Sequence, residues 1–208
     1  DAYILFRRTL IPAGSFKKGY HLLSFLFKKW LFVLLSGFSV LVTILFLRSI
    51  SAGSFSVMLQ SAISELSVAN TGAAYCIFFL IIFIHETGHA SAAYRFGVTP
   101  KEIGIGLYFI YPVFFTNVTD IWKLPAKQRM IVNLAGIYFQ LLINLLLILI
   151  FYTTALKSLC FILLVINTIS VLTSFNPFKD VNDQKKIDGF VDRLKKEQGY
   201  VIRSTEFN

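Results

Sequence analysis

Residues 73 to 94 read AAYCIFFLIIFIHETGHASAAY, so the motif His85-Glu86-Thr87-Gly88-His89 lies inside a continuous apolar run. On a helix, His85 and His89 are one turn apart on the same face, a spacing that suits two ligands of a zinc ion. The glutamate between them, Glu86, is the usual general base for a water bound to zinc. A soluble zinc protease would carry this motif on a helix with one polar face. Because both faces are apolar here, the segment predicts hydrolytic chemistry within a membrane.

A purely structural role is the alternative for this motif. His85, Glu86 and His89 would then form a buried polar cluster that holds neighbouring helices together. An ionisable side chain inside a membrane span is energetically costly, and is a functional-site hypothesis by default. Glu86 therefore favours the catalytic interpretation.

The composition of the chain is that of an integral membrane protein. Of its 208 residues, 56% are hydrophobic and 15% are charged, and the mean hydropathy is +0.69. Soluble domains carry roughly a quarter charged residues. Twenty Lys and Arg residues against eleven acidic residues give a net charge of +9. That charge alone is compatible with a nucleic-acid partner or with an anionic membrane surface, so the distribution of the basic residues has to decide.

Four apolar segments are long enough to cross a bilayer, which takes roughly 17–25 helical residues. They cover about residues 30–47, 72–96, 130–152 and 158–175. The second segment carries the motif and ends near Gly97 and Pro100, residues that stop helices. We expect an all-α membrane protein of about four transmembrane helices with its core at 30–178. Residues 1–29 are expected to form an N-terminal cytoplasmic or interfacial segment, and residues 179–208 a charged cytoplasmic tail.

Basic residues gather on one side of these four segments. They precede the first segment, occur between the second and third, and follow the fourth, whereas the other two connections hold only Arg48 and Lys157 near their ends. By the positive-inside rule, both termini are cytoplasmic. Because this bias accounts for most of the net charge, we expect a lipid bilayer as the environment and no nucleic-acid partner.

Two of the connections contain further predicted elements. Between the first and second spans, apolar residues recur at helical spacing among serines from Phe55 to Leu66, which predicts an amphipathic helix on the outer interface. Between the second and third spans, residues 103–115 are β-branched, aromatic and interrupted by glycine, and Pro112 argues against a spanning helix. This stretch predicts a short β-hairpin.

Two imidazoles and a water leave a tetrahedral zinc one protein ligand short. The remaining histidine, His21, precedes the first span and is interpreted as interfacial. Carboxylates occur just beyond the fourth span, at Asp180, Asp183 and Asp188. The motif lies about 20 Å of helix rise into its span, past the midplane toward the cytoplasm. The predicted topology therefore brings the motif and these aspartates to the same side of the membrane, without choosing among the three.

The combination resembles the site-2 proteases, a family of intramembrane zinc metalloproteases, over roughly residues 30 to 187. That family pairs His-Glu-x-x-His with a later Asn-Pro…Asp-Gly segment, and here Asn176-Pro177 ends the fourth span and Asp183 follows. The pair Ala135-Gly136 in the third span and the 104–115 stretch are similar to the branch associated with peptide maturation and export. The resemblance implies that His85, His89 and Asp183 hold zinc and that Asn176 contacts substrate.

The chain departs from the family pattern at two places. Asp183 is followed by Gln184 rather than glycine, and the one Asp-Gly pair is Asp188-Gly189, farther from Asn176 than the family spacing. Asp183 is still favoured because the residues after it best resemble those that follow the family's ligand. The third span has Gln140 where the family often has the asparagine of Gly-Pro-x-x-Asn. Gln140 is therefore expected either to orient substrate or to hold helices together.

These features together predict a membrane-embedded metallopeptidase with one Zn²⁺, acting on a membrane-associated peptide or protein in or near its membrane segment. Glu86 is expected to take a proton from the zinc-activated water and pass it to the leaving amine. Because a helix in lipid has its backbone groups internally bonded, cleavage requires local unwinding, and the hairpin edge is expected to pair with the unwound strand. The resemblance implies a bacterial cytoplasmic membrane and an export system as a further partner. The alternative is a catalytically inactive protein of the same fold acting in peptide binding, export or immunity.

Overall fold

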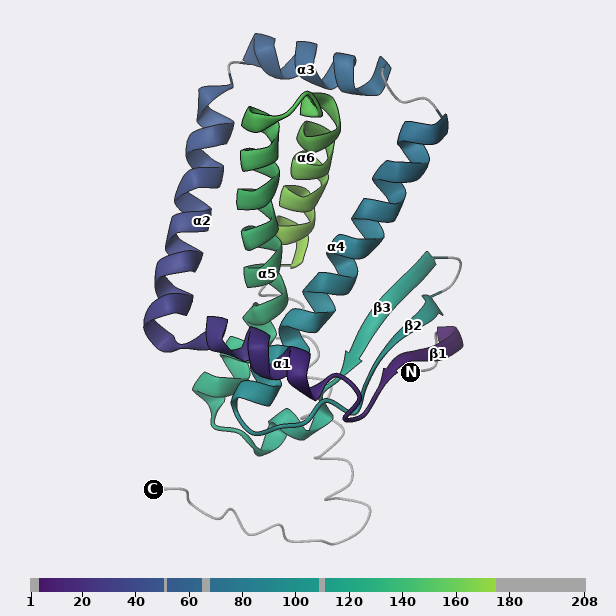
Figure 1. Cartoon of the computed structure of the whole chain (residues 1–208), viewed down its shortest axis with the longest axis vertical. Helices are drawn as coiled ribbons and strands as arrows, with labels where there is room; N and C mark the ends of the chain where they lie inside the picture. Colours follow the sequence, from purple (N-terminus) through teal and green to yellow (C-terminus); the bar gives the residue numbers. More distant parts are fainter. Residues whose placement is uncertain (1–3, 51, 65–67, 109–110, 175–208) are drawn as a thin grey trace, which may run out of the picture. The chain divides into compact units, whose positions relative to one another are not determined.

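In the part of the chain that the structure describes, four helices are long and apolar enough to cross a membrane, and they lie where the sequence predicts them (Figure 1). These helices are α2 (Lys29–Ser49), α4 (Val68–Arg95), α5 (Ala126–Thr153) and α6 (Lys157–Ser174). Each end lies within about four residues of its predicted position, so the predicted helical membrane protein is confirmed.

The computed structural model describes residues 4–50, 52–64, 68–108 and 111–174. Residues 1 to 171 form one unit, whose arrangement is described below. Residues 172 to 208 form a second unit, of which only the end of α6 is described.

The stop signal after the motif helix has the geometry that its sequence indicates. Gly97 adopts a positive φ of 83°, which a glycine accommodates without steric cost. The amide of Val98 then donates to the carbonyl of Ala93 at 3.0 Å, and the amide of Gly97 to that of Tyr94 at 3.1 Å. This Schellman arrangement satisfies carbonyls at the helix end and turns the chain toward the sheet.

The predicted hairpin is part of a three-stranded antiparallel sheet with the order β1-β2-β3. Its strands are β1 (Ile4–Pro12), β2 (Glu102–Tyr108) and β3 (Tyr111–Asn117). The sequence predicts the β2–β3 pair but not β1, which lies within the segment 1–29 that was expected to be only cytoplasmic or interfacial. β1 pairs antiparallel with β2, and Glu102 of β2 adds side-chain contacts across the pair: it accepts a hydrogen bond from Thr9 at 2.5 Å and pairs with Arg7. These two partners hold the pKa of the Glu102 carboxyl below its ordinary value.

Shorter helices complete the described part of the chain. They are α1 (Lys17–Ser24), the 3-10 turn η1 (Phe25–Phe27), α3 (Ala52–Ser64) and the 3-10 turn η2 (Thr119–Lys123). α3 confirms the helix predicted between the first two spans. Within the first unit, α5 packs against both α2 and α4, while α1 and β3 pack against α4 (Figure 1).

The motif lies on α4 between two apolar clusters of the core. One cluster joins η1 and the C-terminal part of α4 to the N-terminal half of α5, and includes Ala92, Val132 and Tyr138. The other joins α2, the middle of α4, α5 and α6, and includes Ile81 and Leu163. His85 lies one turn after Ile81, so the predicted site is placed at the junction of α4, α5 and α6.

Candidate metal centre

The two histidines of the motif bring their Nε2 atoms together at one point. His85 Nε2 lies 3.0 Å from His89 Nε2, and the two ring centroids are 4.8 Å apart. The one-turn spacing on α4 produces this convergence, as the sequence predicts. Both side chains are partly buried in the membrane-spanning part of the protein.

The opposite ring nitrogen of each histidine faces a hydrogen-bond acceptor on α5. His85 Nδ1 lies 3.0 Å from Oε1 of Gln140, and His89 Nδ1 lies 2.7 Å from the carbonyl oxygen of Val132. Since an amide oxygen only accepts, both Nδ1 atoms carry the proton and donate. In the neutral rings, each Nε2 therefore presents a lone pair.

Two lone pairs facing each other at 3.0 Å repel unless a cation lies between them. A tetrahedral zinc with Zn–N distances of 2.0–2.1 Å separates two ligand nitrogens by about 3.3 Å. The observed separation and the fixed tautomers therefore fit two of the ligands of a zinc ion. Histidines that bind metals typically donate their other N–H to a carbonyl or carboxylate in this way.

Gly136 on α5 leaves room at the same point. A Cβ built on Gly136 would come within 3.0 Å of the Nε2 atoms of both His85 and His89, closer than real side chains come. Gly88, inside the motif, faces the same helix, and a Cβ there would lie 2.7 Å from the carbonyl oxygen of Ala135. The absence of side chains at these two positions therefore permits close packing of α4 on α5 and leaves space beside both imidazoles.

Glu86 is in contact with the sheet. The hydroxyl of Thr116, near the end of β3, donates to the backbone carbonyl of Glu86 at 3.0 Å. Thr116 also interacts with the Glu86 side chain. Phe79 and Phe83 of α4 pack edge-on against Phe114, the neighbour of Thr116. These contacts place β3 beside the carboxylate expected to act as the base.

Gln140 connects His85 to α6. Its amide Nε2 donates to Ser170 Oγ at 3.0 Å, while its Oε1 accepts from His85. Asn167 Nδ2 donates to the backbone carbonyl of Gln140 at 2.9 Å and to Asn144 Oδ1 at 2.8 Å. Both ends of the Gln140 side chain are thus used within the protein, and the substrate contact expected for it remains a prediction.

Sequence reasoning missed several residues around the histidines. Thr116 and Ser170 carry no distinguishing signal, and Val132 contributes only a backbone atom. Asn144 and Asn167 are fully buried amides within apolar spans. Because such groups are costly in a membrane, they could have been identified from the sequence as part of a polar network.

The predicted third ligand lies outside the described residues. This holds for Asp183, for its alternatives Asp180 and Asp188, and for Asn176. Within residues 4–50, 52–64, 68–108 and 111–174, no group of three or more His, Cys, Asp or Glu side chains could hold a metal ion. The described part of the chain therefore offers two candidate nitrogen ligands, His85 and His89.

Comparison with known proteins shows the family of this chain. The model of peptidase family M50 matches residues 73–205, a range that begins just before the motif and includes the three aspartates. A protein of Bacillus subtilis (strain 168) named "Putative peptide zinc metalloprotease protein YydH" is 30% identical over 69 residues. That match covers 32% of this chain and 27% of the relative's length. No solved structure matches the chain. Because the family match extends over more than half of the sequence and contains the histidine pair, the chain belongs to peptidase family M50, the site-2 protease family.

Proposed function

We propose that this protein is a membrane-embedded zinc metallopeptidase that hydrolyses a peptide bond in or near the membrane segment of its substrate. Membership of family M50 supports a peptidase function in general. The observation that carries the proposal is the convergence of His85 and His89 through Nε2, with both Nδ1 atoms held by acceptors and with Glu86 next to His85 on α4.

Each described residue has a defined task in this chemistry. Gln140 and the Val132 carbonyl fix the tautomers of His85 and His89, so both Nε2 atoms are free to bind metal. When bound, zinc supplies a Lewis acid that makes water more acidic and stabilises negative charge on the scissile carbonyl oxygen. A carboxylate oxygen of Glu86 accepts the proton of the attacking water and delivers it to the leaving amine as the C–N bond breaks.

Asp183 is proposed as the third protein ligand, with Asp180 and Asp188 as the alternatives. Ser170 near the end of α6 is bonded to Gln140, which contacts His85. A chain spans at most about 3.3–3.6 Å per residue. Asp183 follows Ser170 by 13 residues in the sequence, so the chain is long enough to bring its carboxylate to the histidines. Asn176, six residues beyond Ser170, is proposed to contact the substrate.

We propose that the substrate pairs with the edge of β3. In the sheet order β1-β2-β3, β3 has a strand neighbour on one side within the described residues, and Thr116 brings this strand to Glu86. An unwound substrate segment pairing with β3 would lie extended beside the base. The backbone hydrogen bonds that the substrate loses on unwinding in lipid would then be replaced by bonds to the strand.

The distribution of basic residues supports an orientation in which both termini face the cytoplasm. The site is then reached from the cytoplasmic side of a bacterial membrane, where a membrane-associated peptide passing to an export system would meet it.

The proposal is tested with purified protein in phospholipid vesicles and a library of hydrophobic peptides that carry a fluorophore and a quencher. Glu86→Gln is expected to retain zinc and to lose about 10²–10⁴-fold in cleavage rate. Asp120→Asn is the matched control, because it removes a carboxylate from the exposed turn η2. Equal cleavage by Glu86→Gln and the wild type would exclude Glu86 as the base, and zinc binding without any cleavage would favour the inactive peptide-binding alternative.

A further inference from the structure

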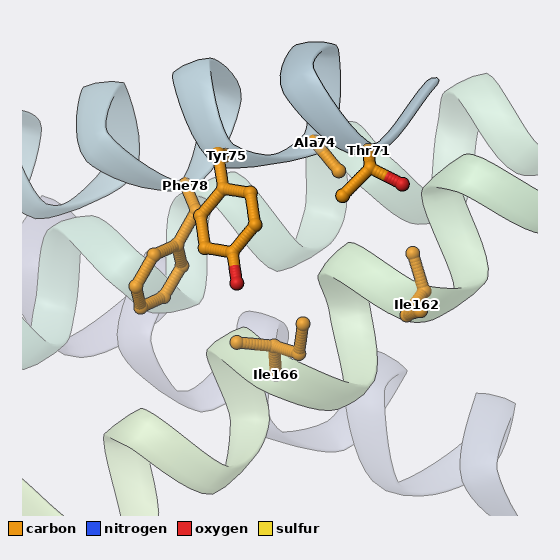
Figure 2. A pocket seen from close by; sticks show the side chains of 6 residues that line it. All are labelled: Thr71, Ala74, Tyr75, Phe78, Ile162 and Ile166. Atoms are coloured by element: carbon orange, nitrogen blue, oxygen red, sulfur yellow. The ribbon is translucent and has the colours of Figure 1, made fainter. Parts of the chain in front are cut away.

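A hollow lies between the N-terminal half of α4 and the middle of α6 (Figure 2). Its volume is about 260 Å³. It is lined by Thr71, Ala74, Tyr75, Phe78, Ile162 and Ile166. Figure 2 shows the Tyr75 ring projecting from α4 toward Ile166 of α6, while Ile162 lies on the side of Thr71 and Ala74. Apart from two hydroxyls, this lining is apolar, so the hollow suits hydrocarbon groups rather than a polar ligand.

The wall contributed by α4 continues directly to the metal centre. Thr71, Tyr75 and Phe78 repeat at spacings of four and three residues, and one further repeat of seven residues leads to His85. At 100° per residue, these positions share one face of the helix. The seven residues from Phe78 to His85 correspond to about 10 Å of helix rise.

The wall contributed by α6 leads to the same place. Ile162 and Ile166 are one turn apart, and the next turn carries Ser170, which binds Gln140 beside His85. The hollow is also open to the lipid, since Tyr75 is 63% exposed and Ile166 is 38% exposed. A ligand could therefore enter sideways from the membrane and lie in line with the histidines.

We propose that this hollow, here called the α4–α6 groove, binds the apolar part of the substrate's membrane segment next to the part that is cut. This inference rests on the proposed peptidase function and adds the surface that would hold the hydrophobic stretch of the substrate. Glu86 lies about 100° around α4 from His85, toward Thr116 of β3. A chain leaving the groove would thus pass the histidines and reach the base and the strand edge.

The size of the groove sets how much of the substrate it takes. Pockets that enclose whole drug-sized ligands have volumes of about 300–1,000 Å³. A volume of 260 Å³ holds a few side chains from one face of a peptide helix rather than the helix itself. The groove would therefore bind side chains of the part of the substrate that stays helical, while the neighbouring part unwinds.

Photo-crosslinking tests the occupant directly. Benzoylphenylalanine replaces Tyr75 or Ile166 in the full chain carrying Glu86→Gln, so that the probe is not cut. The control position is Leu80, which is 54% exposed and lies on the opposite face of α4 from Thr71. The probe is a biotinylated hydrophobic peptide of about 20 Leu and Ala residues with a Gly/Ser/Asn extension, a length that spans the hydrocarbon core, in phosphatidylglycerol vesicles.

The expected result is probe crosslinking at positions 75 and 166, little at position 80, and loss of the signal with excess unlabelled probe. Equal crosslinking at all three positions would overturn the proposal. So would adducts consisting only of phospholipid, or only of a second copy of the chain.

A cleavage experiment separates this proposal from the function on which it rests. Ala74→Trp fills the groove and is expected to reduce kcat/KM about tenfold for a substrate that retains its hydrophobic segment. A short soluble peptide around the same bond is expected to be cut at an unchanged rate, and Leu80→Trp is expected to leave both rates unchanged. If both peptides are affected equally, the groove has no binding role. If the wild type cuts neither peptide, the peptidase function fails, and the crosslinks still report on the groove.

Discussion

Gly136 of α5 lies so close to His85 of α4 that a methyl group at position 136 would collide with the imidazole Nε2. The same methyl group would lie 2.5 Å from Cε1 of His85 and 2.5 Å from Nε2 of His89, so it would press against both rings. Glycine at this position therefore leaves room for both imidazoles where they lie and allows α5 to supply the acceptors that orient both rings.

Gly136→Ala is expected to lower zinc affinity by about 100-fold, since the added methyl group displaces the two imidazoles. Metal content after dialysis against graded concentrations of a chelator measures the loss. Gly37→Ala on α2 is the matched control, because a Cβ there meets nothing within 4 Å. Stoichiometric zinc in Gly136→Ala at the wild-type chelator concentration would contradict this role of the glycine.

Gln140→Leu is expected to weaken zinc binding by about 10–100-fold, because His85 loses the acceptor that holds its tautomer. Gln140→Glu keeps an acceptor oxygen and is expected to restore most of the affinity. The ¹⁵N chemical shifts of the His85 ring in the metal-free protein provide a second measurement, since they report which nitrogen carries the proton.

Asn144→Leu controls for the loss of a buried amide on the same helix. Asn144 bonds to Asn167 and Thr168 but not to His85. Its loss is expected to lower stability by about 0.6 kcal/mol, typical of a hydrogen bond between membrane helices, and to leave zinc affinity unchanged. If Asn144→Leu and Gln140→Leu weaken zinc binding equally, Gln140 acts through helix packing alone.

The sequence was sufficient where the signal is local. Three such signals depend on residues close together in the chain. They are the apolar runs of membrane-spanning length, the helix stop at Gly97 and the glycine-interrupted stretch 103–115. β1 was missed for two reasons. Its partner strand is distant in sequence, since Arg7 and Glu102 are 95 positions apart. In addition, two adjacent arginines interrupt the alternation of polar and apolar residues that is typical of a strand. The acceptor of the His89 hydrogen bond could not be predicted. It is the backbone carbonyl of Val132, and every residue type has such a carbonyl.

The attachment of β1 to β2 is expected to depend on pH through Glu102. Hydrogen bonding from Thr9, together with Arg7, holds the pKa of this carboxyl below its ordinary value. The stabilisation is therefore fully present above the unfolded-state pKa of about 4.3, and is lost as the pH falls through the lower folded-state pKa. Glu102→Gln is expected to increase proteolytic cleavage within β1 about two- to fivefold at pH 7, and to match the wild type once the pH is below the folded-state pKa.

Asp120→Asn distinguishes this effect from a general loss of charge. Asp120 pairs with Lys101 and Lys123 at 3.4 and 3.2 Å, and its pKa is also lowered, first by the hydrogen bond from Lys123. Because Asp120 lies in η2 rather than in the sheet, its replacement is expected to leave the cleavage of β1 unchanged at every pH. Equal effects of the two substitutions would show that the Arg7–Thr9–Glu102 contacts do not hold the strand.

The choice among the three aspartates can be decided by metal content. Asp183→Ala is expected to remove zinc from the purified protein, since two histidines alone leave the coordination of zinc incomplete. Asp180→Ala and Asp188→Ala are expected to retain one zinc each, because their carboxylates are not required for binding. The three variants remove the same charge from the same segment, so each serves as a control for the other two. Zinc retained by Asp183→Ala but lost from Asp180→Ala or Asp188→Ala would transfer the role of third ligand to that residue. Retention by all three single variants would instead require a ligand other than these carboxylates.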